Sequence, residues 1–126
     1  MSKGEMTNNQ WKSLALLGAE RWNEYREKHP DRIPCLCDMD LSTENLENFN
    51  LAGADLRGVN LAMADLSKAD LSDANLDRAN LSRADLSRAS LQRASLAEAN
   101  LYAAFLVDAD LAGASTEEAN MFAVKK

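Results

Sequence analysis

Residues 54–98 read ADLRG VNLAM ADLSK ADLSD ANLDR ANLSR ADLSR ASLQR ASLAE, a series of five-residue blocks that share one pattern. Each block has a small apolar residue, then Asp, Asn or Ser, then a leucine or its equivalent, then two variable residues. The leucine recurs at every fifth position from Leu36 to Leu111, and Thr116 and Met121 continue the register. A repeat of this kind decides the fold before any other property of the chain.

A period of five suits neither regular secondary structure. In an α-helix, five residues advance about 140° beyond a full turn, so the leucines would spiral around the helix. In a strand, an odd period sends successive leucines to opposite faces. The leucines share one interior only if the chain turns a corner after each block and winds into stacked coils, which predicts a solenoid. The predicted core is Leu41, Leu46, Leu51, Leu56, Leu61, Leu66, Leu71, Leu76, Leu81, Leu86, Leu91, Leu96, Leu101, Leu106 and Leu111.

Blocks such as Ala54–Gly58 and Ala84–Arg88 resemble the A(D/N)LXX signature of pentapeptide-repeat proteins, and the resemblance covers residues 34–123. It implies an all-β solenoid, namely a right-handed quadrilateral β-helix with four blocks in each coil. The blocks from Leu36 to Met121 then make about four and a half coils. Small proteins of this type are abundant in cyanobacteria.

Residues 1–33 are predicted to close the N-terminal end, since an open coil is an unpaired edge. Thr7 and Gln10 form a capping-box pattern, which predicts a helix over residues 8–28 that ends before Pro30. The face of this helix that covers the first coil has Trp11, Leu14, Trp22 and Tyr25. At the other end, two alternatives remain for residues 115–126: a last coil, which we favour, or a short capped helix. Residues 124–126 are assigned as a tail.

The candidate interaction site lies near the C-terminus, where aromatic and apolar residues replace the small or polar ones of earlier coils: Tyr102, Phe105, Val107 and Phe122. Tyr102 and Phe122 are twenty residues apart and should stack. Exposed aromatic clusters are typical of interfaces, which predicts binding to a protein partner of unknown identity. Homodimerisation would also hide the open edge. In the alternative, residues 119–126 fold back and cover the rings within one chain.

Composition argues against several other functions. A net charge of −6 disfavours direct binding to nucleic acid or anionic membranes. The early apolar run at 14–19 is too short for a transmembrane helix or signal peptide, so we expect a cytoplasmic protein. An interior filled by leucine and alanine leaves no concave pocket with a nucleophile and a base, so we expect no enzyme activity and no cofactor.

Cys35 and Cys37 are the two cysteines, and one residue separates them. A disulfide between them would be severely strained. With His29 they make three soft ligands, whereas a structural zinc site takes four. We interpret them as reduced thiols under the cap, with no metal, and metal-linked or redox sensing stays open as an alternative.

Acidic charge leaves a second hypothesis. Some pentapeptide-repeat proteins, the quinolone-resistance and related gyrase-binding members, present a DNA-like rod to a topoisomerase. A belt of arginines around the third coil argues against such a surface here: Arg78, Arg83, Arg88 and Arg93. We expect each of them except Arg83 to pair with an acidic residue one coil away. The sequence therefore predicts a non-catalytic scaffold that presents flat faces to a protein, with inhibition of a type II topoisomerase by DNA mimicry as the alternative.

Overall fold

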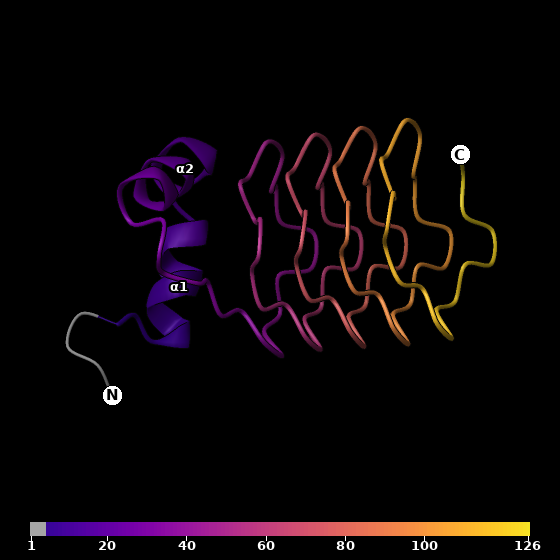
Figure 1. The fold of residues 1–126 in the computed structure, drawn as a ribbon, viewed down its shortest axis with the longest axis horizontal. Coiled ribbons are helices and arrows are strands. Elements are labelled where there is room, and N and C mark those ends of the chain that lie inside the picture. The colour runs from indigo at the N-terminus through magenta and orange to yellow at the C-terminus, as the bar shows by residue number, and fades with distance from the viewer. Residues whose placement is uncertain (1–4) are drawn as a thin grey trace.

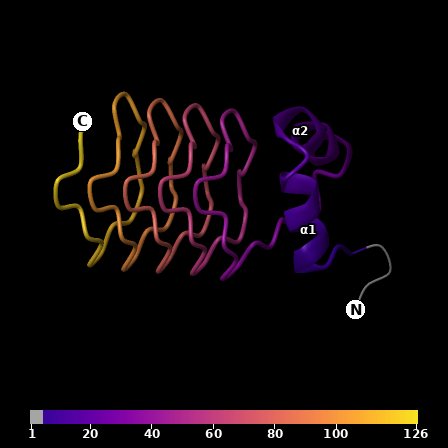
Figure 2. The same cartoon turned by 180° about the vertical axis from the view of Figure 1, so that it is seen from behind.

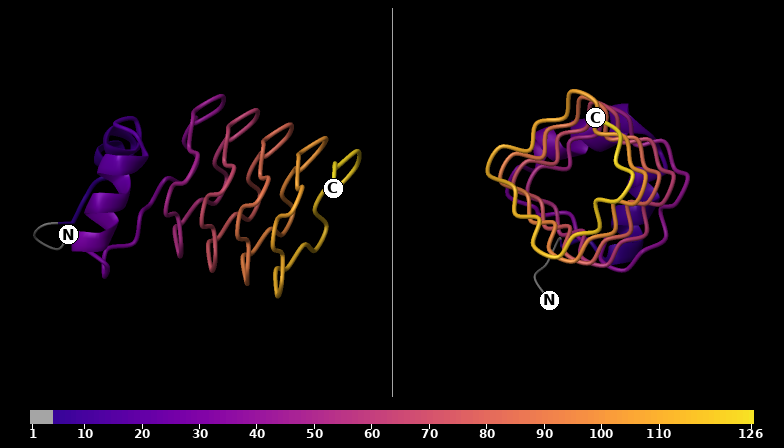
Figure 3. Two further views of the ribbon diagram at one scale, coloured as in Figure 1. Left: turned by 90° about the horizontal axis from the view of Figure 1, so that it is seen from above. Right: turned by 90° about the vertical axis from the view of Figure 1, so that its right-hand side faces the viewer.

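A computed structural model describes residues 5–126, in which two short helices lead into a stack of coils along one axis (Figure 1). Helix α1 spans Asn8–Ala15 and helix α2 spans Ala19–Lys28. The rest of the described chain forms isolated parallel bridges between residues twenty apart, from Cys35–Asp55 to Phe105–Lys125. One coil therefore takes twenty residues, and about four and a half coils are bridged. Viewed down the axis, successive coils overlay in a four-lobed outline (Figure 3).

Each corner is a β-turn that begins at the leucine. The leucine carbonyl accepts a hydrogen bond from the N–H three residues later, as from Ala84 to Leu81 at 3.0 Å. The second residue after the leucine, which we call the turn position, has a positive φ, such as 60° at Arg78. A type II turn requires this conformation and favours glycine there. All three glycines of the solenoid occupy turn positions: Gly53, Gly58 and Gly113.

The residue just before each leucine, which we call the cap position, closes the turn. Where it is Asp or Asn, its side-chain oxygen accepts the N–H two residues later. Asn80 accepts from Ser82 at 3.0 Å, and Asp85 accepts from Ser87 at 2.9 Å. This Asx turn gives a physical reason for the Asp and Asn of the repeat.

The interior is filled by the leucines and by the small residue two positions before each of them. Every predicted core leucine from Leu41 to Leu106 is at most 4% exposed. Leu111 is only half-buried, because no further coil of the described residues covers it. Leu111 therefore packs against the edge of the core, and the fully buried leucines end at Leu106.

The N-terminal cap is two helices, so the prediction of one helix over residues 8–28 is wrong. The chain breaks at Gly18, whose φ of 102° lies outside the helical region. The break folds α1 against α2, with the Trp11 and Trp22 rings 5.6 Å apart. The predicted capping box forms, since Thr7 and Gln10 exchange hydrogen bonds. Both helices lie at the same end of the coil stack when it is seen from behind (Figure 2).

Side chains of α2 replace the coil that is missing before the first one. Trp22 Nε1 donates to the Asn50 carbonyl at 2.7 Å, and the Asn50 N–H donates to Asn23 Oδ1 at 2.8 Å. Arg26 Nη2 donates to the Ala52 carbonyl at 2.6 Å. Of the predicted cap residues, Trp11 and Trp22 are buried, whereas Leu14 and Tyr25 are partly buried against the core. The first edge of the solenoid is thus sealed by specific contacts.

The C-terminal end continues as a coil, which decides between the two alternatives for residues 115–126. Ser115 bridges to Ser95, and Lys125 bridges to Phe105 within the segment 124–126 assigned as a tail. Of the predicted N-terminal segment 1–33, residues 1–4 lie outside the described residues. Neither helix of the described chain is long and apolar enough to cross a membrane.

Candidate functional site

The last coil leaves an unpaired backbone edge, which we call the C-terminal rim and define as residues 106–125. In earlier coils, each leucine N–H and the N–H two residues later donate to the next coil, as Leu91 does to Asp110 at 2.7 Å. In the described chain, the corresponding N–H groups of the C-terminal rim beyond Leu106 donate to no backbone carbonyl. These groups belong to Asp108, Leu111, Gly113, Thr116, Glu118, Met121 and Ala123.

The C-terminal rim also exposes part of the interior. Leu111, Met121 and Val124 pack against the core from one side and are half-buried. A backbone edge with free donors beside half-exposed apolar side chains is a surface on which another chain can add. No helix of the described residues covers this end, in contrast to the N-terminal end (Figure 1).

Of the predicted interface residues, Val107 and Phe122 belong to the C-terminal rim, and Tyr102 and Phe105 lie in the coil just before it. The Tyr102 and Phe122 rings are stacked, with centroids 6.0 Å apart and planes 13° apart. Phe122 is 72% exposed, whereas Phe105 and Val107 are 38% and 42% exposed. Residues 119–126 continue the coil, and Phe122 and Lys125 of this segment lie over Tyr102 and Phe105 within the chain, which leaves both of these rings partly exposed. Phe105 faces Lys125, whose Nζ lies 4.6 Å from the ring centroid.

Phe105 occupies a cap position, where its ring cannot accept the hydrogen bond that closes the turn. One coil earlier, Asp85 accepts from the Ser87 N–H at this place. Val107, the equivalent of Ser87, has no such side-chain acceptor in the described chain, and it is itself exposed. The hydrogen bond of the turn therefore does not explain phenylalanine here, and its ring instead lies beside the ammonium group of Lys125 in the next coil.

Charges on the C-terminal rim are separated. Glu117 and Glu118 lie in one block, and Lys125 and Lys126 lie seven to nine residues further along the chain, less than half of a twenty-residue coil. Phe122 lies between these two groups along the chain, whereas Phe105 is bridged to Lys125 and lies beside the basic group. The C-terminal rim thus has Glu117 and Glu118 in one part and Lys125 in another, and Asp108 and Asp110 add further acidic charge.

The arginine belt is a consequence of the repeat. Arg78, Arg83, Arg88 and Arg93 all occupy turn positions with positive φ, and they point from four sides. Arg93 pairs with Asp73 at 2.9 Å, as expected. Arg83 lies over Tyr102, 5.2 Å from its centroid. The pairs expected for Arg78 and Arg88 do not form in the described chain. Four arginines on different sides do not converge on one ligand.

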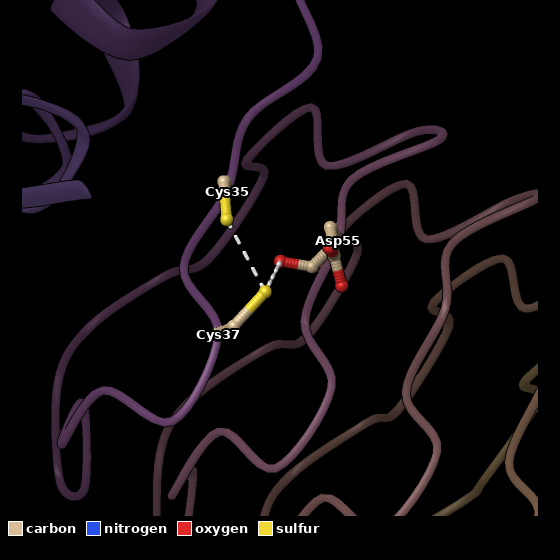
Figure 4. Close-up of side chains that lie close together, drawn as sticks. All are labelled: Cys35, Cys37 and Asp55. Atoms are coloured by element: carbon tan, nitrogen blue, oxygen red, sulfur yellow. Dashed lines mark hydrogen bonds between the residues drawn. The ribbon is translucent and has the colours of Figure 1, made fainter. Parts of the chain in front are cut away.

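A second cluster lies near the N-terminal end, where Cys35, Cys37 and Asp55 meet (Figure 4). The two Sγ atoms are 3.2 Å apart, and both thiols are free. Burial, followed by hydrogen bonds of the thiol with Asp55, which accepts, and with Cys35, raises the pKa of Cys37 to about 12. A thiol with so high a pKa is a poor nucleophile at neutral pH.

The carboxylate of this cluster is fixed by an arginine. Arg57 donates to Asp55 through Nε at 2.8 Å and Nη2 at 2.7 Å, which lowers the pKa of Asp55 to about 2. His29 is not a member of the cluster, and its ring lies against Tyr25 with centroids 4.4 Å apart. Sequence reasoning grouped the cysteines with His29 and missed Asp55, although the twenty-residue stacking period places Asp55 beside Cys35.

Comparison of this chain with known proteins and family models finds matches to one family. Residues 45–73 and 74–113 match the family model described as pentapeptide repeats, in eight copies. A pentapeptide repeat protein from the thylakoid lumen of Arabidopsis thaliana is 30% identical, with a TM-score of 0.67 over 69% of this chain and 61% of its own. No protein with a curated description matches in sequence.

Two cyanobacterial structures are also similar. HetL, involved in heterocyst differentiation regulation in Nostoc sp., is 40% identical over 70% of this chain and 45% of its own, with a TM-score of 0.52. Rfr23 from Cyanothece is 27% identical over 82% of this chain and 92% of its own, with a TM-score of 0.52. The present chain spans less than two thirds of the Arabidopsis protein and of HetL. These neighbours imply a right-handed quadrilateral β-helix.

Proposed function

The chain belongs to the pentapeptide-repeat family, and from this premise we propose that it is a non-catalytic interaction protein that pairs with a second copy of itself through the C-terminal rim. Proteins of this family are generally structural or interaction proteins. The observation on which the proposal depends is the difference between the two ends. The first edge is closed by Trp22, Asn23 and Arg26, and the C-terminal rim is not.

Pairing of two C-terminal rims would give the free donors partners and cover the half-exposed interior. A hydrogen bond that replaces one to water contributes about 0.5–1.5 kcal/mol, so the backbone edge alone contributes modestly. Burial of apolar surface adds about 25 cal/mol for each Å² removed from water. Phe122, the most exposed aromatic residue, supplies such surface beside the C-terminal rim.

The charges of the C-terminal rim favour a second copy as the occupant. A two-fold axis perpendicular to the solenoid and running between the acidic and basic groups would place Lys125 opposite Glu117 and Glu118 of the partner subunit. The same operation repeats the contact, because a two-fold interface uses each patch twice. Phe122 would then lie near its own copy. Exposed pairs of this kind contribute mainly to orientation and rate of association.

The test compares two surface changes by sedimentation equilibrium. Phe105→Asp restores the usual cap residue, and Tyr102→Ser restores the serine found at Ser42 and Ser82, so the double variant should fold normally. Met63→Ser removes an exposed apolar residue far from the C-terminal rim and serves as the control. We expect the wild type to dimerise, the double variant to dimerise at least tenfold more weakly, about 1.4 kcal/mol, and the control to match the wild type. A monomeric wild type, or equal dimerisation of all three, contradicts the proposal.

Mimicry of DNA has less support. A duplex presents one negative charge for each ~1.7 Å of its axis on a uniformly anionic surface. Here, the four turn-position arginines encircle the solenoid and interrupt any such surface. Supercoiling by purified gyrase in the presence of this protein would test the alternative directly, and inhibition at micromolar protein would favour it.

A further inference from the structure

The cluster of Cys35, Cys37 and Asp55 has the ligand types of a site for a soft divalent metal. Its ligand atoms are two thiol sulfurs and one carboxylate oxygen, which all lie within 4.8 Å of one another. Thiolate sulfur favours zinc and cuprous copper among the common metals. All three residues are partly buried, which limits competition from water without closing the site. The cluster lies at the end of the solenoid opposite the C-terminal rim.

The spacing of the sulfurs favours tetrahedral over linear coordination. At a zinc–sulfur distance of about 2.3 Å, a tetrahedral angle holds two sulfurs roughly 3.8 Å apart, whereas linear coordination holds them roughly 4.6 Å apart. The observed separation is 3.2 Å. Tetrahedral zinc needs the sulfurs to part by about half an ångström, which small side-chain rotations supply, whereas linear cuprous copper needs much more.

We propose that Cys35, Cys37 and Asp55 bind one Zn²⁺ ion with tetrahedral geometry and an open fourth position. His29 is turned against Tyr25, so a water molecule completes the coordination. Binding of Zn²⁺ releases the protons of the two thiols to solvent and forms two zinc–sulfur bonds and one zinc–oxygen bond, with no change in oxidation state.

Arg57 orients the Asp55 carboxylate and still leaves it able to bind a metal ion. Each carboxylate oxygen has two lone-pair directions, so Asp55 can accept from Arg57 and still bind a metal ion. Carboxylate ligands in metal sites are commonly held by such outer hydrogen bonds. Because Asp55 belongs to the second coil and the cysteines to the first, the ion joins two coils just beneath the helical cap.

The repeat itself supplies variants that keep the fold. Serine occupies the cap position at Ser90, Ser95 and Ser115, so Cys35→Ser should be tolerated. Asparagine caps the turn at Asn60 and Asn75, so Asp55→Asn removes the carboxylate and keeps the turn. Asp65→Asn makes the same change at a cap position away from the cysteines and is the matched control.

In the first experiment, reduced protein without an affinity tag is titrated with Zn²⁺ in competition with a chromogenic chelator. In the second, it is titrated with Co²⁺, and the absorption spectrum is recorded. We expect one equivalent of Zn²⁺, and a tetrahedral cobalt spectrum with thiolate-to-metal charge transfer. Both should be lost in Cys35→Ser and in Cys37→Ser, and Zn²⁺ affinity should fall at least tenfold in Asp55→Asn but not in Asp65→Asn. Thermal unfolding gives an independent readout, since Zn²⁺ should raise the Tm of the wild type and not that of the cysteine variants.

Two outcomes would overturn the inference. If the variant with both cysteines replaced still binds Zn²⁺, or if the wild type binds no Zn²⁺, the cysteines do not form a zinc site. Equal Zn²⁺ affinity of Asp55→Asn and the wild type would show that the Asp55 carboxylate is not a ligand, and that the ion does not join the two coils. Neither result bears on dimerisation through the C-terminal rim, so the two proposals fail separately.

Discussion

Two leucines in the same repeat position should differ several-fold in their contribution to stability. Leu81 is 0% exposed and has a coil on either side, whereas Leu111 is half-buried at the C-terminal rim. Leu→Ala removes three carbon groups, worth about 0.8 kcal/mol each when fully buried, or about 2.4 kcal/mol. Leu81→Ala also leaves a closed cavity, which brings the expected loss to about 3–5 kcal/mol. Leu111→Ala loses roughly half of the transfer free energy and leaves no closed cavity, so we expect about 1 kcal/mol.

The measurement is urea unfolding followed by circular dichroism, in a background with Tyr102→Ser and Phe105→Asp and at a protein concentration at which this double variant is monomeric. The free energy of unfolding and its dependence on urea are fitted together, because a repeat protein can unfold from one end. Equal losses for the two substitutions would mean that the C-terminal rim is covered within a single chain. That result would refute both the end effect and the open edge on which the proposed function depends.

Two further predictions concern single sites in the solenoid. Gly58→Ala should destabilise the protein more than Gly53→Ala in the same unfolding assay. Both glycines have a positive φ, but a Cβ at Gly58 would overlap the Asp38 carboxylate, whereas a Cβ at Gly53 has no atom within 4 Å. Equal losses of unfolding free energy would contradict the overlap. The pKa of Asp55 is lowered to about 2 in the folded state from about 3.9 in an unfolded chain, so its ionised form contributes stability above about pH 4 that is lost as the pH falls through 2. Asp55→Asn should therefore reduce the decline of the unfolding free energy between pH 4 and pH 2 by up to ~1 kcal/mol. An unchanged decline would contradict the ion pair.

The sequence was sufficient for the architecture because one repeat fixes the whole solenoid. A leucine at every fifth position has few three-dimensional solutions, and the coils with bridges between residues twenty apart agree with the predicted one. The turns were harder to predict, because most turn positions have residues such as Arg78 that favour no left-handed conformation. Gly53, Gly58 and Gly113 are the turn residues that favour this conformation, and the leucine period does not depend on them.

Errors in prediction concentrate where the repeat ends. The helical periodicity of residues 8–28 continues across Gly18, and only the packing of Trp11 on Trp22 reveals that the chain must reverse there. Leu111 has the same sequence environment as Leu81, so its exposure follows from the position of the last coil and not from the motif. Local patterns describe each repeat well, but they say little about which neighbours a terminal repeat lacks.

Both proposed sites coincide with cap positions that break the rule of the repeat. Nearly every cap position has Asp, Asn or Ser, and the Asp and Asn side chains accept the hydrogen bond that closes the turn, as at Asn80 and Asp85. The exceptions are Cys35, Phe105 and Lys125, of which the first belongs to the metal cluster and the other two lie together at the C-terminal rim. In a repeat whose interior is uniform, a side chain that gives up a local hydrogen bond costs stability, about 0.5–1.5 kcal/mol. We therefore expect binding in this chain at the cap positions that depart from Asp, Asn and Ser.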